Sequence, residues 1–547
     1  MNMQTLNTAP QGWWQPNGSR FETGQRALDE ALLQVSRPIF LIRRNDSIGV
    51  CQQGSITIGK DKPDKADIRP LIGYAAALHP QNLGDAAFKK AYNLRYAYLV
   101  GAMANGITSV EMVEECGRAG MIGFFGAGGL LPAEIETAVD TLQQRMESLP
   151  FGFNLIHSPT HPELEQATVE LYLRRGVKLV SASAYLDLTA ALVYYRIQGI
   201  HRDSNGKIVC PNRVIAKVSR IEVASKFFAP PPEKHLKQLV NRQLITTEQA
   251  ALASTIPMAD ALTCEADSGG HTDNRPAITL LPTMLALRDE LTEKYHYPEP
   301  MSVGLAGGIA TPGSVAAAFA MGAAYVLTGS INQACIEAGT SDTVRRMLAE
   351  TAQADVTMAP SADMFELGVK LQVLKRGTMF ALRAGKLYEL YSRYLSYEQI
   401  PQDQRRVLER DLFRCSFHEQ WEQTRNFFAP RDPSQIALAE KNPRHKMALV
   451  FRSYLGRSAT WATSGDSSRK IDYQIWCGPA MGAFNQWVRG SFLEGCENRK
   501  TVTVAMNLLF GAAVMMRANG LRHQGVTLDP SVGRFYPLEL EKIMQLI

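Results

Sequence analysis

One histidine ends a glycine-rich segment that directly follows a predicted strand. The segment reads Cys264-Glu-Ala-Asp-Ser-Gly-Gly-His271, and its two glycines, Gly269 and Gly270, let a ligand approach the backbone closely. An imidazole can donate a proton near neutral pH. The segment therefore predicts that His271 is a catalytic acid. The alternative is a histidine that only caps a loop.

Two later strands end in small residues of the kind that surround a phosphate. The first reads Met301-Ser-Val-Gly-Leu-Ala-Gly-Gly-Ile309 and the second Tyr325-Val-Leu-Thr-Gly-Ser330, with an alanine-rich helical stretch between them. Glycine lets backbone N–H groups approach an anion, and the next helix N-terminus favours negative charge. These turns predict a phosphate-bearing cofactor, and the alternative is two ordinary turns without a ligand.

Further residues could contact the rest of such a cofactor. In Gly101-Ala-Met-Ala-Asn-Gly-Ile-Thr108, small residues around one methionine suit a flat ring, although an ordinary tight turn has the same composition. Asn154 and Lys217 are single polar residues inside apolar strands, so each must find a polar partner. A flavin ring would satisfy both, and so would a buried hydrogen bond or ion pair.

These residues are positioned by an alternation of short apolar strands and helical patterns. Short runs that are apolar on both faces are typical of buried parallel strands. Eight such units predict an α/β fold, a (β/α)8 TIM barrel, rather than an open sheet. The expected strands cover residues 97–101, 121–125, 151–155, 178–182, 213–218, 260–265, 301–305 and 324–328.

Three regions are expected along the 547 residues. Residues 1–90 form an N-terminal appendage that reads as irregular apart from one hairpin. Residues 91–340 form the barrel, with an insertion at 225–256 that could form a lid at the catalytic face. Residues 341–547 form an all-helical domain without clear strands, and its first predicted helix covers 364–376.

Bulk properties argue against several classes of function. The net charge of +5, without a clustered basic face, gives no reason to expect a nucleic acid partner. The eight cysteines show no CxxC or zinc-finger spacing, so we expect no metal site and free thiols in a reducing cytoplasm. The apolar stretch 502–516 is too short for a membrane span and predicts a buried helix. The expected protein is cytoplasmic and has no membrane segment.

Six motifs occur in order between about residues 95 and 335. They are Ala102-Met103-Ala104, Gly126-Ala-Gly-Gly-Leu-Leu-Pro132, Pro150-Phe-Gly-Phe-Asn154, Asp267-Ser-Gly-Gly-His271, Ala306-Gly-Gly-Ile309 and Leu327-Thr-Gly-Ser330. This series is similar to the FMN-dependent nitronate monooxygenase and FabK-type enoyl reductase superfamily.

A closer resemblance covers nearly the whole chain. Four further motifs resemble the PfaD-type trans-acting enoyl reductases, which serve polyunsaturated fatty acid synthases and trans-acyltransferase polyketide synthases. They are Ala75-Ala-Ala-Leu-His-Pro80, Met379-Phe-Ala-Leu-Arg383, Lys386-Leu-Tyr388 and Asp472-Tyr-Gln-Ile-Trp-Cys-Gly-Pro-Ala-Met-Gly-Ala-Phe-Asn485. The resemblance implies a bound FMN, NADPH as reductant, and an acyl carrier protein that presents the substrate.

The resemblance also assigns roles to residues of this sequence. The FMN phosphate would be held by Gly307, Gly308, Gly329 and Ser330. The isoalloxazine ring would be backed by Ala102, Met103 and Ala104. Its polar edge would contact Asn154 and Lys217, and His271 would stand beside it after Gly269 and Gly270. The insertion at 225–256 departs from the monooxygenases, which favours a site for a carrier-bound chain over a small nitronate pocket.

The resulting hypothesis is an NADPH-dependent, FMN-containing reductase of 2-enoyl thioesters on acyl carrier protein, in polyunsaturated fatty acid or polyketide biosynthesis. The alternatives are a nitronate monooxygenase and a non-catalytic megasynthase subunit, and a homodimer is possible. Between Lys441 and Lys470 there are seven Lys/Arg residues and one acid, Asp466. Such a stretch could dock an acidic carrier protein, and the alternative is a solvated or internally paired face.

Overall fold

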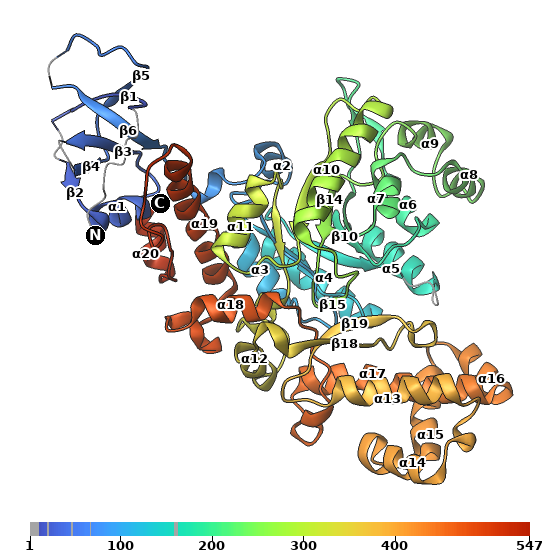
Figure 1. Ribbon diagram of the computed structural model, residues 1–547. Coiled ribbons are helices and arrows are strands. Elements are labelled where there is room, and N and C mark those ends of the chain that lie inside the picture. The colour runs from blue at the N-terminus through green and yellow to red at the C-terminus, as the bar shows by residue number, and fades with distance from the viewer. Residues whose placement is uncertain (1–9, 19–20, 45–46, 66, 158–161) are drawn as a thin grey trace.

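The computed structural model describes residues 10–18, 21–44, 47–65, 67–157 and 162–547. Figure 1 shows a small N-terminal β-sheet region, a central α/β barrel, and a mostly helical region that lies below the barrel in this view. The long helix α19 (Thr501–His523) runs back to the N-terminal sheet and packs against it. The C-terminal end of the chain therefore lies beside that sheet (Figure 1).

Within the described residues, eight parallel strands close into a barrel in the order β10-β13-β14-β16-β17-β7-β8-β9. This confirms the predicted fold class, because each strand lies within two residues of its expected range. The strands are β7 (Tyr98–Val100), β8 (Ile122–Phe125), β9 (Gly152–Ile156), β10 (Leu179–Ser183), β13 (Arg213–Val218), β14 (Ala261–Glu265), β16 (Ser302–Ala306) and β17 (Val326–Thr328).

Helices surround the barrel, and several begin at a capping side chain. Ser109, Thr189 and Thr311 each accept a hydrogen bond from a backbone N–H in the first turn of the helix that follows. These caps set where each βα loop ends, and so they hold the loops that carry the candidate site. The surrounding helices are α3 (Val110–Arg118), α4 (Pro132–Met146), α5 (Pro162–Arg174), α6 (Ala190–Ile197), α7 (Ile221–Phe228), α10 (Ala277–Lys294) and α11 (Pro312–Ala320). Helix α12 (Asp342–Ala349) lies outside this ring, below the barrel in Figure 1.

The insertion after β13 forms α8 (Glu233–Asn241) and α9 (Thr247–Ala253). Both helices pack against α6, on the outside of the helical ring (Figure 1). Nε2 of His235 in α8 lies 3.0 Å from the carbonyl oxygen of Leu188, just before α6. The expectation that this insertion forms a lid is therefore wrong, because it supports the barrel wall from outside.

The N-terminal region is a sheet rather than the irregular appendage that the sequence predicted. As far as it is described, it has six strands in the order β2-β4-β3-β6-β1-β5, and α1 (Gln25–Leu33) packs beside them. Neighbouring residues of β6 face different apolar clusters, since Ile72 belongs to the large central cluster that also contains Leu28, whereas Leu71 belongs to a small cluster with Trp14. The strands are β1 (Gly12–Gln15), β2 (Glu22–Thr23), β3 (Ile39–Arg44), β4 (Ser47–Cys51), β5 (Ser55–Ile58) and β6 (Arg69–Ala75).

Helix α19 confirms the buried helix predicted over 502–516. Among the described residues it is the one helix long and apolar enough to cross a membrane, and 83% of its apolar window is buried inside the protein. The amide of Asn507 donates to the carbonyl oxygens of Thr503 (2.9 Å) and Leu538 (2.8 Å). A Cβ at Gly511 would lie 2.6 Å from Cγ of Pro312, so this glycine lets α19 pack closely on α11.

The region after residue 340 is mainly helical, as predicted, but it also contains strands. The helix expected over 364–376 is wrong, because β19 (Lys370–Leu374) lies in that range, and β18 (Val356–Pro360) precedes it. They form one antiparallel sheet with β15 (Gly270–His271), which follows the barrel strand β14. The main helices are α13 (Phe380–Arg393), α14 (Gln402–Val407), α15 (Phe417–Phe428), α16 (Pro433–Lys441), α17 (Pro443–Ser464) and α18 (Ala480–Val488).

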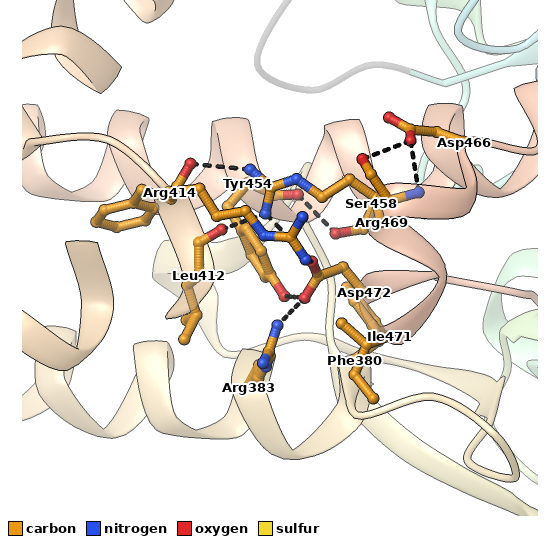
Figure 2. Close-up of polar contacts among 12 residues, drawn as sticks. Phe380, Arg383, Leu412, Arg414, Tyr454, Ser458, Asp466, Arg469, Ile471 and Asp472 are labelled. Carbon is orange, nitrogen blue, oxygen red and sulfur yellow. Dashed lines mark hydrogen bonds and ion pairs between the residues drawn. The ribbon is translucent and has the colours of Figure 1, made fainter. Parts of the chain in front are cut away.

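A buried carboxylate ties this helical region together (Figure 2). Asp472 is fully buried, accepts hydrogen bonds from the hydroxyl of Tyr454 (2.7 Å) and from Nη1 of Arg469 (3.2 Å), and pairs with Arg383. Arg469 also donates to the carbonyl oxygen of Leu412 (2.6 Å). Because these residues come from distant parts of the region, one network of charges fixes several helices relative to one another.

Candidate active site

The inner face of the barrel changes from apolar to polar toward the carboxyl ends of the strands. Side chains alternate along a strand, so Lys217 shares a face with Ile215, and Glu265 shares one with Ala261. Ile215 and Ala261 belong to the apolar cluster that fills the barrel. Lys217, Glu265 and, by the same alternation in β9, Asn154 therefore face the mouth of the barrel.

Asn154 lies where a ligand would complete its hydrogen bonds. The residue is buried, and its Oδ1 has no hydrogen-bond partner among the described residues. A Cβ at Gly128 would lie 3.6 Å from Nδ2 of Asn154 and 3.4 Å from Cβ of Ala104. A buried polar atom without a partner costs about 1–3 kcal/mol. The position therefore suits a ligand that offers a donor to this oxygen.

The loop predicted to back a flat ring is held next to Asn154. The N–H of Asn105 donates to the carbonyl oxygen of Gly128 (2.7 Å). The hydroxyl oxygen of Thr108 accepts from the N–H of Met103 (2.9 Å), which closes the loop on itself. The structure thus brings Ala102, Met103 and Ala104 to the mouth of the barrel beside Asn154.

The other predicted polar residue, Lys217, already has a charged partner. Its Nζ lies 2.8 Å from Oε1 of Glu265, and the hydroxyl of Ser268 donates to the same oxygen (3.3 Å). Of the two explanations that the sequence left open, the ion pair is present. Both side chains keep some exposure, 23% and 18%, so Lys217 can still donate another hydrogen bond to a ligand at the mouth.

The turns after β16 and β17 leave open space beside their backbone. Gly307 and Gly308 have φ values of 84° and 73°, in the left-handed region that favours glycine. A Cβ at Gly307 would lie 2.5 Å from the carbonyl carbon of Ala266, so this turn packs on the segment that leads to the histidine. No described atom lies within 4 Å of a Cβ at Gly308 or Gly329. The result is a cradle that a side chain would fill and that an anion can occupy.

A segment of the C-terminal region closes over both turns. The N–H of Gly478 donates to Oγ of Ser330 (3.2 Å). A Cβ at Gly269 would lie 2.9 Å from the backbone nitrogen of Cys477, and one at Gly478 would lie 2.8 Å from that of Gly269. The two backbones therefore touch, and the absence of a side chain at both glycines permits this contact. The contact joins the predicted phosphate turn and the histidine loop to the C-terminal region.

His271 is also held by that region. β15 pairs with β19, and His271 lies opposite Leu371. The side-chain amide of Gln372 donates to Oδ1 of Asp267 (2.9 Å) and to the carbonyl oxygen of Ser268 (2.7 Å). The histidine therefore stands on the edge strand of a small sheet rather than on a free loop.

β18 and β19 form a hairpin, and an acidic side chain from the connection between them faces His271. Nε2 of His271 lies 3.3 Å from Oδ1 of Asp363, in the connection between β18 and β19. Partial desolvation disfavours the imidazolium, but the neighbouring Asp363 carboxylate outweighs it, so the pKa of His271 is raised, while both side chains stay partly exposed, 40% for His271 and 59% for Asp363. Burial acts to raise the pKa of Asp363, whereas the pairing with His271 lowers it to about 2. The pair therefore favours the ionised state of both groups.

A second histidine stands at the same rim, although its sequence context gave no signal for it. His157 follows β9, and its Nδ1 lies 3.0 Å from Oε2 of Glu165. Glu165 is buried and also accepts hydrogen bonds from the hydroxyls of Tyr185 (3.0 Å) and Thr189. The imidazole stacks on Tyr185, with ring centroids 5.1 Å apart. This network fixes the rim between β9 and β10.

The basic residues between 441 and 470 do not form one face. Arg444 lies over the ring of Tyr391 in α13, whereas Lys446 lies over an aromatic ring of α15. Arg452 pairs with Glu366 at 3.2 Å. Because these side chains are used inside the helical region, the structure favours the internally paired alternative over a carrier-docking surface at this stretch.

Two family models match the chain. The one described as nitronate monooxygenase matches residues 88–376, which cover the barrel together with β18 and β19. The one described as the inserted helical domain of acyl-carrier-protein S-malonyltransferase matches residues 394–473. The chain therefore belongs to the nitronate monooxygenase family.

The chain is also similar to individual proteins named for polyketide or polyunsaturated fatty acid synthesis. The polyketide biosynthesis protein PksE of Bacillus subtilis is 47% identical over 458 residues, which are 84% of this chain and 59% of that protein. One of the polyunsaturated fatty acid synthase subunits of Thraustochytrium sp. is 44% identical over 505 residues, 91% of this chain and 24% of that protein. The chain thus spans less than two thirds of the length of each of these relatives.

A solved structure of one domain is similar to this chain over the whole length of that domain. The enoyl reductase domain of MlnA, from the macrolactin biosynthesis cluster of Bacillus amyloliquefaciens, matches with a TM-score of 0.76 and 40% identity. The match covers 82% of this chain and 100% of that domain. Within its family, the chain therefore groups with the PfaD-type enoyl reductases.

Proposed function

We propose that the protein is an NADPH-dependent, FMN-containing reductase of 2-enoyl thioesters carried by an acyl carrier protein. The observation that carries this proposal is the buried Oδ1 of Asn154, which has no partner among the described residues and faces the same barrel mouth as the glycine cradle. The likeness to the MlnA enoyl reductase domain supports the choice of substrate. The synthase components among the relatives support the carrier protein as partner.

The residues at the barrel mouth fit FMN. Gly307, Gly308, Gly329 and Ser330 would hold its phosphate, and Ala102, Met103 and Ala104 would back its flat ring. Asn154 would accept a hydrogen bond from the ring, and Lys217 would donate one to the polar edge. When bound, FMN supplies a carrier for hydride between NADPH and the enoyl group.

The reaction requires a hydrogen-bond donor and a proton source, which residues of this chain can supply. NADPH, a proton and a 2-enoyl thioester give NADP⁺ and a saturated acyl thioester, with hydride added at carbon 3 and the proton at carbon 2. The thioester oxygen gains negative charge as hydride arrives, so it needs a hydrogen-bond donor. We propose that His271 either donates a hydrogen bond to that oxygen or delivers the proton to carbon 2.

A reconstituted assay tests the function. The purified chain is given NADPH and a 2-enoyl group on a carrier protein without oxygen, and the product is analysed by mass. Formation of the saturated thioester, with equal consumption of NADPH, supports the proposal. Turnover that requires oxygen and a nitronate would instead indicate a monooxygenase. A protein that purifies without flavin and turns over neither substrate would indicate a non-catalytic subunit.

A further inference from the structure

We propose that Asp363 is a positioning residue for His271, so that the C-terminal region completes the proton donor of the barrel. The use of the proton rests on the proposed enoyl reduction. The pairing itself is a property of the folded chain and can be measured without turnover.

The hairpin that carries Asp363 is fixed to the histidine loop. β19 lies between β15 and β18 in one antiparallel sheet, and Gln372 in β19 bonds to Asp267 (2.9 Å) at the start of the loop. The same hairpin carries a second acid, Glu366, which points to Arg452 at 3.2 Å. The hairpin therefore presents the Asp363 carboxylate to His271, at 3.3 Å from Nε2.

Other charges near His271 offset one another. Glu265, from β14, favours the imidazolium, and Lys217, from β13, opposes it. These two side chains pair with each other at 2.8 Å, so their opposite fields at His271 largely cancel. Asp363 is then the charged group that decides the protonation of His271.

The pair also determines which ring nitrogen can act. With Nε2 of His271 3.3 Å from Oδ1 of Asp363, we assign the Nε2–H to that carboxylate in both the charged and the neutral imidazole, which leaves Nδ1 as the atom that gains and loses the proton. In the charged form the Nδ1–H bond breaks as a C–H bond forms at carbon 2, and the electron pair stays on Nδ1. Water then returns a proton to Nδ1. Asp363 stabilises the imidazolium, and it keeps the neutral imidazole in the tautomer whose Nδ1 can accept a proton.

The test compares Asp363→Asn with Glu366→Gln in the full-length protein. The second variant removes an acid from the same hairpin that does not contact His271. The imidazole pKa of His271 is measured by NMR with labelled histidine, and His271→Asn assigns the signal. We expect a lower pKa in Asp363→Asn, because the carboxylate that favours the imidazolium is lost, and little change in Glu366→Gln.

Activity gives a second readout. In Asp363→Asn the alkaline limb of enoyl turnover should move to lower pH, and turnover should fall about tenfold or more, the scale for losing a partner that orients a histidine. Flavin reduction by NADPH should change little. Asp363→Glu, which keeps the charge, should recover most of the pKa of His271.

The outcomes distinguish the proposed role of Asp363 from the proposed enoyl reductase activity. An unchanged pKa of His271 in Asp363→Asn overturns the pairing, and so does an equal shift in Glu366→Gln, which would mean that the whole hairpin is disturbed. If the pKa falls as expected but the wild type reduces no enoyl thioester, the pairing stands and the function fails. If the wild type is active and Asp363→Asn keeps its pH profile, the function stands and the positioning role fails.

Discussion

Replacing Gly308 by leucine should empty the proposed flavin site without unfolding the protein. Gly308 has a φ of 73°, and no described atom lies within 4 Å of a Cβ there. The new side chain would therefore enter the cradle rather than clash with the fold. An L-residue in this left-handed conformation costs about 1–2 kcal/mol, which is small against the usual 5–15 kcal/mol of stability.

The expected loss of affinity follows from the hydrogen bonds that the phosphate would lose. A hydrogen bond to a charged group contributes about 1.5–3 kcal/mol. Displacing a phosphate from two backbone N–H groups would then cost about 3–6 kcal/mol, or roughly 10²–10⁴-fold in FMN affinity. Gly308→Leu should purify colourless, and a fluorescence titration should need correspondingly more FMN to saturate it.

Gly206 offers a matched control. It lies in the hairpin between β11 (His201–Arg202) and β12 (Ile208–Val209), with a φ of 77° and no described atom within 4 Å of a Cβ. Gly206→Leu imposes the same backbone cost at a distance from the candidate site and should purify yellow. A Gly308→Leu protein with normal flavin affinity would refute the reasoning, and so would a Gly206→Leu protein that loses flavin equally.

Three further substitutions test other parts of the molecule. His271→Ala should keep FMN but lose about 10²-fold or more of enoyl turnover, the scale of general acid–base catalysis. Stopped-flow measurement should show a nearly normal NADPH half-reaction, and equal slowing of both halves would assign the histidine to the cofactor instead. Arg517→Met should lower the free energy of unfolding by about 2–4 kcal/mol in a urea titration. The reason is that the Arg517 guanidinium donates to the carbonyl oxygens of Leu32 (2.7 Å) and Gln34 (3.2 Å) at the end of α1. Unchanged stability would contradict this prediction. Asp472→Asn should cost about 3–5 kcal/mol, since it leaves buried guanidinium groups without their carboxylate, and thermal unfolding that matches the wild type would show that the network is dispensable.

The barrel could be predicted because its signal is local. Each barrel strand is a continuous apolar run, and the helical patterns between the runs leave few other arrangements. The N-terminal sheet gives a local signal only in the predicted hairpin, which is present as β3 and β4, because β2 has two residues, both exposed, and β5 is mostly exposed. β19 also lacks a local signal, because its partner β15 has two residues and lies about a hundred positions earlier in the chain.

The candidate site likewise contains residues that have a local sequence signal and residues that have none. His271 and the glycine turns stand in local motifs, so the sequence could point to them. Asp363 and Gly478 act through contacts with segments far away in the sequence, and no local pattern contains that information. The partner of Lys217 is an intermediate case. Lys217 lies opposite Thr263 on the next strand, so strand register alone could have drawn attention to Glu265, two residues further on.

The C-terminal region contributes contacts to the proposed active site and is more than an appended module. Gly478 bonds to Ser330 in the proposed phosphate turn, Cys477 touches the backbone of the histidine loop, and Asp363 faces His271. Cys477 and Gly478 follow a few residues after Asp472, whose buried charge network fixes the helices of that region (Figure 2). A disturbance of that network would therefore move the backbone that closes the site. Loss of stability in the helical region should then appear first as weaker flavin retention, before the barrel itself unfolds.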